Sequence, residues 1–356
     1  MSLPLHGSNP AYVYEAFNLL KPHHVIDFSV NTNPFGPPSI LKDAWQHLFN
    51  FVEDYPDPCG HQLVTLIAEQ ENLKESSILL GNGGAELISC MARLLSGKRV
   101  LIVQPTFSEY EKVCRMNDCD VAFIFLDETW ELNASAIIQQ LKNTDALFLC
   151  HPNNPTGIVY EQEELLKILE ACEYYNCLFI IDEAFYDFAI EKTTLSSYLE
   201  ESSHLVILRS LTKMYAIAGL RLGYVLAQPT VIEKLRRLKP YWSVNALALK
   251  AGELCLQDSS IVHRTQAFIA KEYKRLYEQL TNIGFMLSNS RVNFYLLRDP
   301  TLSKQDALMK WLLQKDIVPR HTYNFPRLEG DWLRLAIKRE KENDLLLEAL
   351  QEWRQT

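Results

Sequence analysis

Short and almost continuously apolar segments alternate with longer helix-like segments between residues 77 and 226. Strands that are buried on both faces of a sheet have this pattern, because neither face meets water. The segments that we expect to form strands are SSILL (76–80), RVLIVQ (99–104), ALFLC (146–150), CLFIID (177–182), HLVIL (204–208) and LGYVLA (222–227). The intervening segments, such as 85–97 and 161–175, are expected helices. The alternation predicts an α/β fold with a mainly parallel sheet flanked by helices.

The pattern changes after Pro240. A long helical stretch leads to a strand candidate, VNFYLLR (292–298), which is followed by a helix, another strand (WLRLAIK) and a final helix. We therefore expect a smaller C-terminal α+β domain. The predicted organisation is an N-terminal arm (1–36) associated with the small domain and the substrate site, a large domain (37–240) and a small domain (241–356).

Charge and cysteine usage exclude several classes of protein. The net charge of -9 argues against a nucleic-acid binder, which would have a basic stripe. None of the eight cysteines forms a CxxC pair, so no metal site is expected, and reduced thiols favour a cytoplasmic protein. The N-terminus has no signal-peptide pattern, and no apolar run reaches membrane-spanning length, so no membrane partner is expected.

Polar or aromatic residues follow each of the first three expected strands. GNGGAE (81–86) follows the first, and glycines before a helix allow backbone N–H groups to contact a phosphate, although a tight turn is the alternative. Phe107 follows the second strand and either stacks on a planar ring or packs in the core. HPNNPTG (151–157) follows the third strand and supplies an amide. The carboxyl ends of parallel strands meet at one edge of a sheet, so we expect these residues around one crevice.

The next two strands end near groups of opposite charge. Asp182 closes CLFIID, and Lys213 follows HLVIL among hydroxyl and small apolar residues. A lysine in weakly polar surroundings has a lowered pKa and a free amine for imine chemistry; a snorkelling lysine or an Asp182–Lys213 ion pair is the alternative. One ligand fits all of these groups, pyridoxal 5'-phosphate. Its phosphate would bind the glycine-rich segment, its planar ring the aromatic and the amide, its ring nitrogen the acid, and its aldehyde the lysine.

The motifs NNPTG, DEAF, SLTK and GLRLGY, in this order and spacing, resemble those of the fold-type I pyridoxal-phosphate enzymes of the aspartate aminotransferase superfamily. The resemblance covers nearly the whole chain and implies that residues 37–240 form the cofactor-binding domain. It implies two catalytic residues, Lys213, which forms an imine with the cofactor aldehyde, and Asp182, which keeps the pyridine nitrogen protonated. The other implied cofactor ligands are Asn154 at the ring hydroxyl, Phe107 stacked on the ring, and Ser210, Arg221 and the amides around Gly83, Gly84 and Ala85 at the phosphate.

The resemblance also implies a homodimer with its active sites at the subunit interface. Tyr55, in DYPDP, matches the tyrosine that reaches the cofactor phosphate of the other subunit.

Within the superfamily, the chain resembles most the histidinol-phosphate aminotransferases and the threonine-phosphate decarboxylases of cobalamin synthesis. Three segments favour the decarboxylases: HGSN (6–9), DFSVNTNPFGPP (27–38) and DEAFYDF (182–188), in which Phe185 stands where the aminotransferases usually have a tyrosine. The neighbouring Tyr186 is expected to point to the opposite side if the strand continues.

The resemblance implies a phosphorylated amino-acid substrate with two anionic groups. Arg334 would bind the carboxylate as a bidentate pair, and Asn154 lies among the implied substrate ligands. Arg320, His6 and Asn31 would bind the phosphate. From the residues alone, the alternatives are a surface position for Arg320 and a disordered terminus for His6.

The expected reaction is the decarboxylation of L-threonine O-3-phosphate to (R)-1-amino-propan-2-ol O-2-phosphate, with Lys213 returning a proton to Cα. One alternative is a histidinol-phosphate or related aminotransferase that uses 2-oxoglutarate. Another is a non-enzymatic binding protein. The reaction depends on which Cα bond stands perpendicular to the cofactor ring, which the sequence does not resolve.

Overall fold

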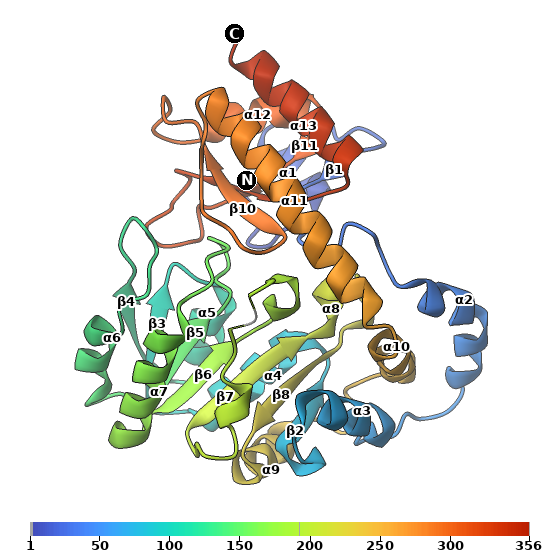
Figure 1. Ribbon diagram of the computed structural model, residues 1–356, viewed down its shortest axis with the longest axis vertical. Helices are drawn as coiled ribbons and strands as arrows, with labels where there is room; N and C mark the ends of the chain where they lie inside the picture. Colours follow the sequence, from blue (N-terminus) through green and yellow to red (C-terminus); the bar gives the residue numbers. More distant parts are fainter. Residues whose placement is uncertain (1–2, 192, 356) are drawn as a thin grey trace.

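A seven-stranded sheet forms the centre of the larger domain in the computed structural model, which describes residues 3–191 and 193–355 (Figure 1). The strand order is β2-β8-β7-β6-β5-β3-β4, and β8 runs antiparallel to both of its neighbours while the other pairs are parallel. The prediction of a mainly parallel sheet is confirmed. The strands are β2 (Ile78–Gly81), β3 (Arg99–Gln104), β4 (Asp120–Phe125), β5 (Ala146–Cys150), β6 (Leu178–Asp182), β7 (Leu205–Ser210) and β8 (Gly223–Ala227).

Strand β4 was not among the expected strands. It pairs only with β3 and lies at the edge of the sheet, where most of its side chains are partly exposed. Its sequence nevertheless has a continuous apolar run, VAFIFL (121–126), which the expected strands did not include.

Helices cover both faces of the sheet, as predicted (Figure 1). Alternate strand residues pack into two separate cores, with Val100 and Ile102 in one and Leu101 and Val103 in the other. This alternation explains the continuous apolar runs, because both sets of side chains are buried. On the first face lie α4 (Gly83–Leu94), α5 (Glu109–Met116) and α9 (Pro229–Leu238); on the second lie α3 (His61–Glu71), α6 (Ala134–Leu141), α7 (Gln162–Tyr175) and α10 (Ala246–Leu256).

The smaller domain is built on a four-stranded antiparallel sheet of order β12-β13-β10-β9. Its strands are β9 (Met286–Leu287), β10 (Phe294–Arg298), β12 (Arg320–His321) and β13 (Leu333–Ala336), and its helices are α11 (Ser260–Asn282), α12 (Asp306–Gln314) and α13 (Glu340–Trp353). The N-terminal segment joins this domain, because β1 (Ile26–Asp27) pairs in parallel with β11 (Ile317–Val318). The N-terminal segment also includes α1 (Pro10–Ala16), and α2 (Ser39–Leu48) follows it.

The long helical stretch expected after Pro240 is two helices, α10 and α11. Asp258 separates them, and its Oδ1 accepts hydrogen bonds from the amide and hydroxyl of Ser260 at 3.1 and 2.5 Å. Helix α10 packs on α2 and α3, whereas α11 packs on α13. The predicted domain boundary near residue 240 stays a prediction. Within the described ranges, no helix combines the length and the apolar character needed to cross a membrane.

Gly157 lies at a close contact between the HPNNPTG loop and the small domain. Its φ is +76°, and an added Cβ would lie 2.1 Å from Ser290 Oγ. Ser290 is held in place, since its Oγ donates to the Phe294 carbonyl at 2.5 Å. The Arg291 amide donates to the Gly157 carbonyl at 2.9 Å. Only glycine fits this position without strain.

Gly157→Ala is expected to lower the free energy of unfolding by roughly 2–5 kcal/mol, because overpacking adds to the cost of a left-handed residue. Gly97→Ala is the matched control, since Gly97 has φ +73° but no atom within 4 Å of the added Cβ. It should lose only about 1–2 kcal/mol in denaturant unfolding. Equal losses in the two variants would contradict the contact with Ser290.

Candidate active site

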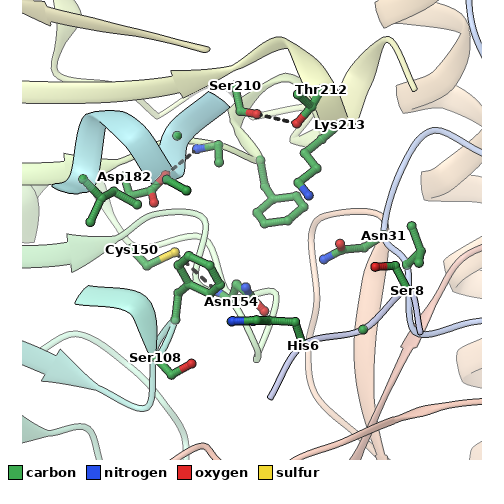
Figure 2. Close-up of a pocket in the computed structure, with 18 of the residues that line it drawn as sticks. His6, Ser8, Asn31, Ser108, Cys150, Asn154, Asp182, Ser210, Thr212 and Lys213 are labelled. Carbon is green, nitrogen blue, oxygen red and sulfur yellow. Dashed lines mark hydrogen bonds between the residues drawn. The ribbon is translucent and has the colours of Figure 1, made fainter. Parts of the chain in front are cut away.

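A cavity of about 350 Å³ lies at the carboxyl edge of the large sheet, beneath the N-terminal segment and the small domain (Figure 2). The ends of β3, β5, β6 and β7 all contribute to it. Most of the residues predicted for the site line this one cavity: His6, Asn31, Gly84, Ala85, Phe107, Asn154, Asp182, Ser210, Lys213, Arg221, Arg320 and Arg334. Gly83 and Tyr55 are not among its lining residues.

Lys213 lies on α8 (Leu211–Met214), a single helical turn that follows β7 directly. Its side chain extends into the cavity (Figure 2). Burial lowers the pKa of the amine to about 8, and the positive charges of Arg334 and Arg221 act in the same direction. A substantial fraction of this amine is therefore uncharged and nucleophilic near neutral pH.

Asp182 does not pair with Lys213; instead it accepts two hydrogen bonds from the large domain. Tyr110 Oη donates to Asp182 Oδ2 at 2.5 Å, and the Ala184 amide donates to Oδ1 at 3.0 Å. Burial raises the pKa of Asp182, while the hydrogen bonds from Tyr110 and Ala184 oppose that shift. A cationic group opposite this carboxylate would favour its ionised form.

The contact of Tyr110 with Asp182 was not predicted. Tyr110 lies in the first turn of α5, shortly after the end of β3. Its ring is fully buried and stacks on Phe148, with centroids 5.3 Å apart, so the hydroxyl needs an internal partner. The available signal was that Tyr110 and Asp182 both lie near the carboxyl ends of strands of one sheet, β3 and β6.

Arg334, on β13, is held by neutral oxygens. Its Nη1 donates to Asn154 Oδ1 at 2.5 Å and its Nη2 to the Ser29 carbonyl at 2.9 Å, whereas its buried Nε has no partner among the described residues. Burial lowers its pKa to about 10.

Arg320, on β12, has a similar environment. Its Nη2 donates to Asn324 Oδ1 at 2.6 Å and also to the Leu5 carbonyl, and burial lowers its pKa to about 9. Its Nη1 and the amide nitrogen of Asn31 are buried without a partner in the described chain. The orphaned atoms of Arg320, Arg334 and Asn31 are all donors, so they suit an anionic ligand.

The start of α4 forms a second donor-rich part of the cavity. Gly84 and Ala85 lie in its first turn, and Ser210 Oγ, at the end of β7, is 2.8 Å from Thr212 Oγ1. An added Cβ on Gly83 would lie 2.5 Å from Arg221 Nη2. Gly83 therefore allows the arginine to approach the helix start, although it does not line the cavity. A helix N-terminus beside an arginine fits a phosphate.

The N-terminal segment closes the cavity from above. His6 Nε2 lies 2.9 Å from Glu109 Oε1, and its ring centroid is 5.7 Å from that of Phe107. The His321 ring hydrogen-bonds to the Pro4 carbonyl at 2.8 Å. His6 is thus ordered between the two domains and lines the cavity, with Glu109 as its neighbour.

Two further residues lie away from the cavity. Tyr55 is 83% exposed, and its ring centroid is 5.0 Å from that of Trp242. Its contact with the cofactor of another subunit stays a prediction. Strand β6 ends at Asp182, so the strand that was expected to direct Tyr186 does not continue. Tyr186 lies instead in a short 3-10 helix, with its ring 3.7 Å from the Arg209 guanidinium.

Pyridoxal 5'-phosphate fits the residues of this cavity. A lysine with a lowered pKa is available for its aldehyde, and the buried carboxylate of Asp182 suits its ring nitrogen. Phe107 lines the cavity as an aromatic neighbour for its ring, and the start of α4 with Arg221 suits its phosphate. The orphaned donors of Arg320, Arg334 and Asn31 remain for a second anionic ligand.

Comparison with known proteins agrees with this geometry. The sequence profile of the family "Aminotransferase class I and II" matches residues 23–350. Threonine-phosphate decarboxylase of Salmonella typhimurium is 37% identical over 97% of this chain and 95% of its own length.

Two solved structures share the fold along nearly the whole chain. Histidinol-phosphate aminotransferase of Clostridium acetobutylicum has a TM-score of 0.87 at 31% identity, covering 92% of this chain and 98% of that one. L-threonine-O-3-phosphate decarboxylase of Porphyromonas gingivalis has a TM-score of 0.83 at 26% identity, covering 92% and 99%. The chain therefore belongs to the class I and II aminotransferase family.

Proposed function

We propose that the protein is a pyridoxal-phosphate-dependent decarboxylase of L-threonine O-3-phosphate. The observation that carries the proposal is the pair of buried arginines, Arg320 and Arg334, which share one cavity with Lys213 and donate to neutral oxygens rather than to a carboxylate of the described residues. A single substrate with a phosphate and a carboxylate would satisfy both guanidinium groups at once. The similarity to the Salmonella typhimurium enzyme supports the same substrate class.

The residues of the chain have distinct roles in this reaction. When bound, pyridoxal 5'-phosphate withdraws electrons from the Cα of an amine that is joined to its aldehyde. Asp182 holds the proton on the ring nitrogen and is itself oriented by Tyr110. Arg334, fixed by Asn154 and Ser29, orients the carboxylate so that the Cα–carboxylate bond breaks and CO2 leaves. Lys213 then supplies the proton that replaces CO2 on Cα.

Phe185 favours decarboxylation over the alternative. Its side chain lines the cavity and packs edge-on against Phe294, with ring centroids 4.8 Å apart, so no hydroxyl is present at this position. The runner-up is a histidinol-phosphate aminotransferase, which the structural similarity to the Clostridium acetobutylicum enzyme favours. The two reactions share the cofactor and differ in which Cα bond breaks.

The proposal includes a homodimer. Residues 45–55 expose Trp45, Phe49, Val52 and Tyr55, and the exposed Trp242 contacts both Tyr55 and Tyr241. So many exposed aromatic side chains are typical of a surface that another protein covers. Tyr55 would then contact the cofactor phosphate in the second subunit. A cytoplasmic location, which the eight cysteines favour, also remains a proposal.

The proposed function is tested by incubating the protein and cofactor with L-threonine O-3-phosphate in the absence of any keto acid. The expected result is CO2 release over many turnovers, together with an aminopropanol phosphate. Activity that needs both histidinol phosphate and 2-oxoglutarate, without CO2 release, would identify the aminotransferase instead.

The rate at which Lys213 captures free pyridoxal 5'-phosphate should increase with pH and level off above about 8. The reason is that only the uncharged amine reacts and burial lowers its pKa to about 8. Stopped-flow absorbance of the cofactor-stripped protein measures this rate. Lys213→Ala should give no visible band at any pH, and a midpoint near the ordinary lysine value, above 10, would contradict the lowered pKa.

Arg320→Gln should weaken L-threonine O-3-phosphate binding by roughly tenfold to a hundredfold, because a charge-assisted hydrogen bond to the phosphate is lost. Binding of L-threonine, which has no phosphate, should change little. Arg334→Gln is the matched comparison and should weaken both ligands, since each has a carboxylate. Spectral titration of the bound cofactor measures the four affinities. An equal loss of both ligands in Arg320→Gln would overturn the assignment of this arginine to the phosphate.

A further inference from the structure

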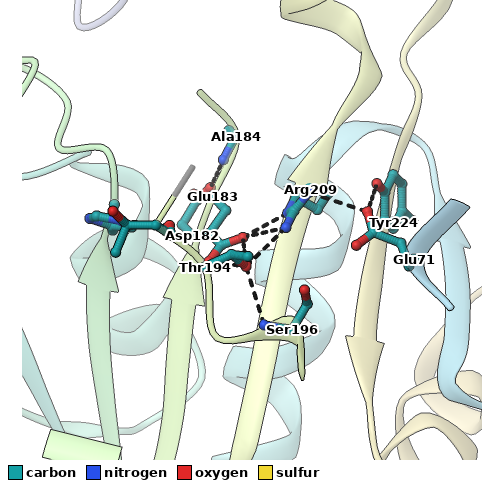
Figure 3. Close-up of polar contacts among 10 residues, drawn as sticks. Glu71, Asp182, Glu183, Ala184, Thr194, Ser196, Arg209 and Tyr224 are labelled. Carbon is teal, nitrogen blue, oxygen red and sulfur yellow. Dashed lines mark hydrogen bonds and ion pairs between the residues drawn. The ribbon is translucent and has the colours of Figure 1, made fainter. Parts of the chain in front are cut away.

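A cluster of buried charges lies next to Asp182 and Ser210 but is not part of the reaction described above (Figure 3). Glu183 follows Asp182 directly, and Arg209 precedes Ser210 directly. Consecutive residues of an extended chain point in opposite directions. Arg209 also borders the cavity, but its guanidinium group donates to Glu183 and Glu71, neither of which lines it.

Glu183 and Arg209 form a buried ion pair. Arg209 Nε donates to Glu183 Oε2 at 2.7 Å, and Nη2 lies 2.7 Å from the same oxygen. Thr194 Oγ1 donates to Glu183 Oε1 and Oε2 at 3.0 and 2.9 Å and accepts from Arg209 Nη2 at 3.1 Å. The side chains of Arg209 and Glu183 are 4% and 0% exposed. Burial of this kind makes the pair strongly directional, because no water competes with it.

The outer part of the cluster lies farther from the cavity. Arg209 Nη1 donates to Glu71 Oε1 on α3 at 3.2 Å, and Tyr224 Oη donates to the same oxygen at 3.0 Å. Neither Glu71 nor Tyr224 is a neighbour in sequence of a residue that lines the cavity. Substitutions in this outer part therefore serve as controls, because they affect the same arginine without changing a sequence neighbour of a cavity residue.

The backbone pairing of β6 and β7 ends where this ion pair begins. The last residues in register are Asp182 and Leu208, and the Glu183 amide donates to the Leu208 carbonyl at 2.8 Å. Arg209 and Ser210 pair instead with Tyr224 and Gly223 of β8, on the other side. Past this point, the Glu183–Arg209 contact joins the two chain ends that carry Asp182 and Ser210.

We propose that Glu183 and Arg209 are positioning residues that fix the spacing between Asp182 and Ser210. These two residues face opposite parts of the cofactor, the ring nitrogen and the phosphate, so their spacing has to match its length. The inference rests on the cofactor of the proposed function and not on the reaction that the cofactor supports. A site whose supporting contacts are lost holds its ligand less well even when the fold survives.

The test replaces the three charges together, in Glu183→Leu with Arg209→Met and Glu71→Gln, so that Glu71 is not left as an unpaired buried charge. Replacing all the partners of a buried ion pair often retains stability. The equilibrium dissociation constant for pyridoxal 5'-phosphate is measured on the full chain by spectral titration, beside the melting temperature. We expect binding weaker by about tenfold or more, as found for outer residues of metal sites, with a melting temperature close to that of the wild type. An unchanged dissociation constant would overturn the proposal.

Glu71→Gln is the matched control, because it alters the outer partner of Arg209 and leaves Glu183 in place. It should leave cofactor affinity unchanged even if the melting temperature falls. Equal weakening in Glu71→Gln would mean that the cluster acts only on stability, against the proposal. If the combined variant does not fold, Thr194→Val provides the same comparison, since it removes the hydrogen bonds of Thr194 to the pair together with the one from the Ser196 amide. Weaker cofactor binding in this variant supports the proposal, and unchanged binding overturns it.

The titration contains no substrate, so its outcome is independent of which reaction the enzyme catalyses. A wild type that binds the cofactor but releases no CO2 from L-threonine O-3-phosphate would refute the proposed function alone. A wild type that does not bind the cofactor would refute both proposals.

Discussion

Buried positive charge without a matching carboxylate is the constraint on which the cavity depends. Transfer of an unpaired cation from water into a protein costs on the order of several kcal/mol. Arg320 and Arg334 are nevertheless oriented by neutral oxygens, those of Asn154, Asn324 and backbone carbonyls. Neutral acceptors fix the direction of a guanidinium group without cancelling its charge. The cavity therefore keeps its attraction for anions, and an anionic ligand returns part of the lost stability when it binds.

Arg209 shows the opposite arrangement in the same chain. It is as deeply buried as the cavity arginines, but two carboxylates, those of Glu183 and Glu71, surround it. Its charge is compensated within the fold, so it has no remaining attraction for a ligand. The partner groups, and not the degree of burial, therefore distinguish a structural arginine, which is paired with carboxylates, from a binding arginine, which is held by neutral oxygens.

The sequence predicted the large sheet and the residues at its carboxyl edge well, because both depend on local patterns. Continuous apolar runs identified the central strands, and each polar strand end was adjacent in sequence to its strand. The edge strand β4 and the break between α10 and α11 were missed although both have a local pattern, the apolar run VAFIFL (121–126) and the polar residues DSS (258–260). The contact between Tyr110 and Asp182 joins residues 72 positions apart, and the widest pair of the cluster around Arg209, Tyr224 with Glu71, joins residues 153 positions apart. No spacing rule predicts such contacts.

The N-terminal segment has a consequence for the order in which the molecule assembles. The carbonyls of Pro4 and Leu5 are bound by His321 and Arg320, and the Ser29 carbonyl is bound by Arg334. Contacts between such distant parts of a chain form late, since a long loop must close first. During synthesis, residues 4–29 must wait for residues 320–334 before they find their partners. The strands of the large sheet are made before residues 320–334, so the cavity closes only after this later segment has been synthesised.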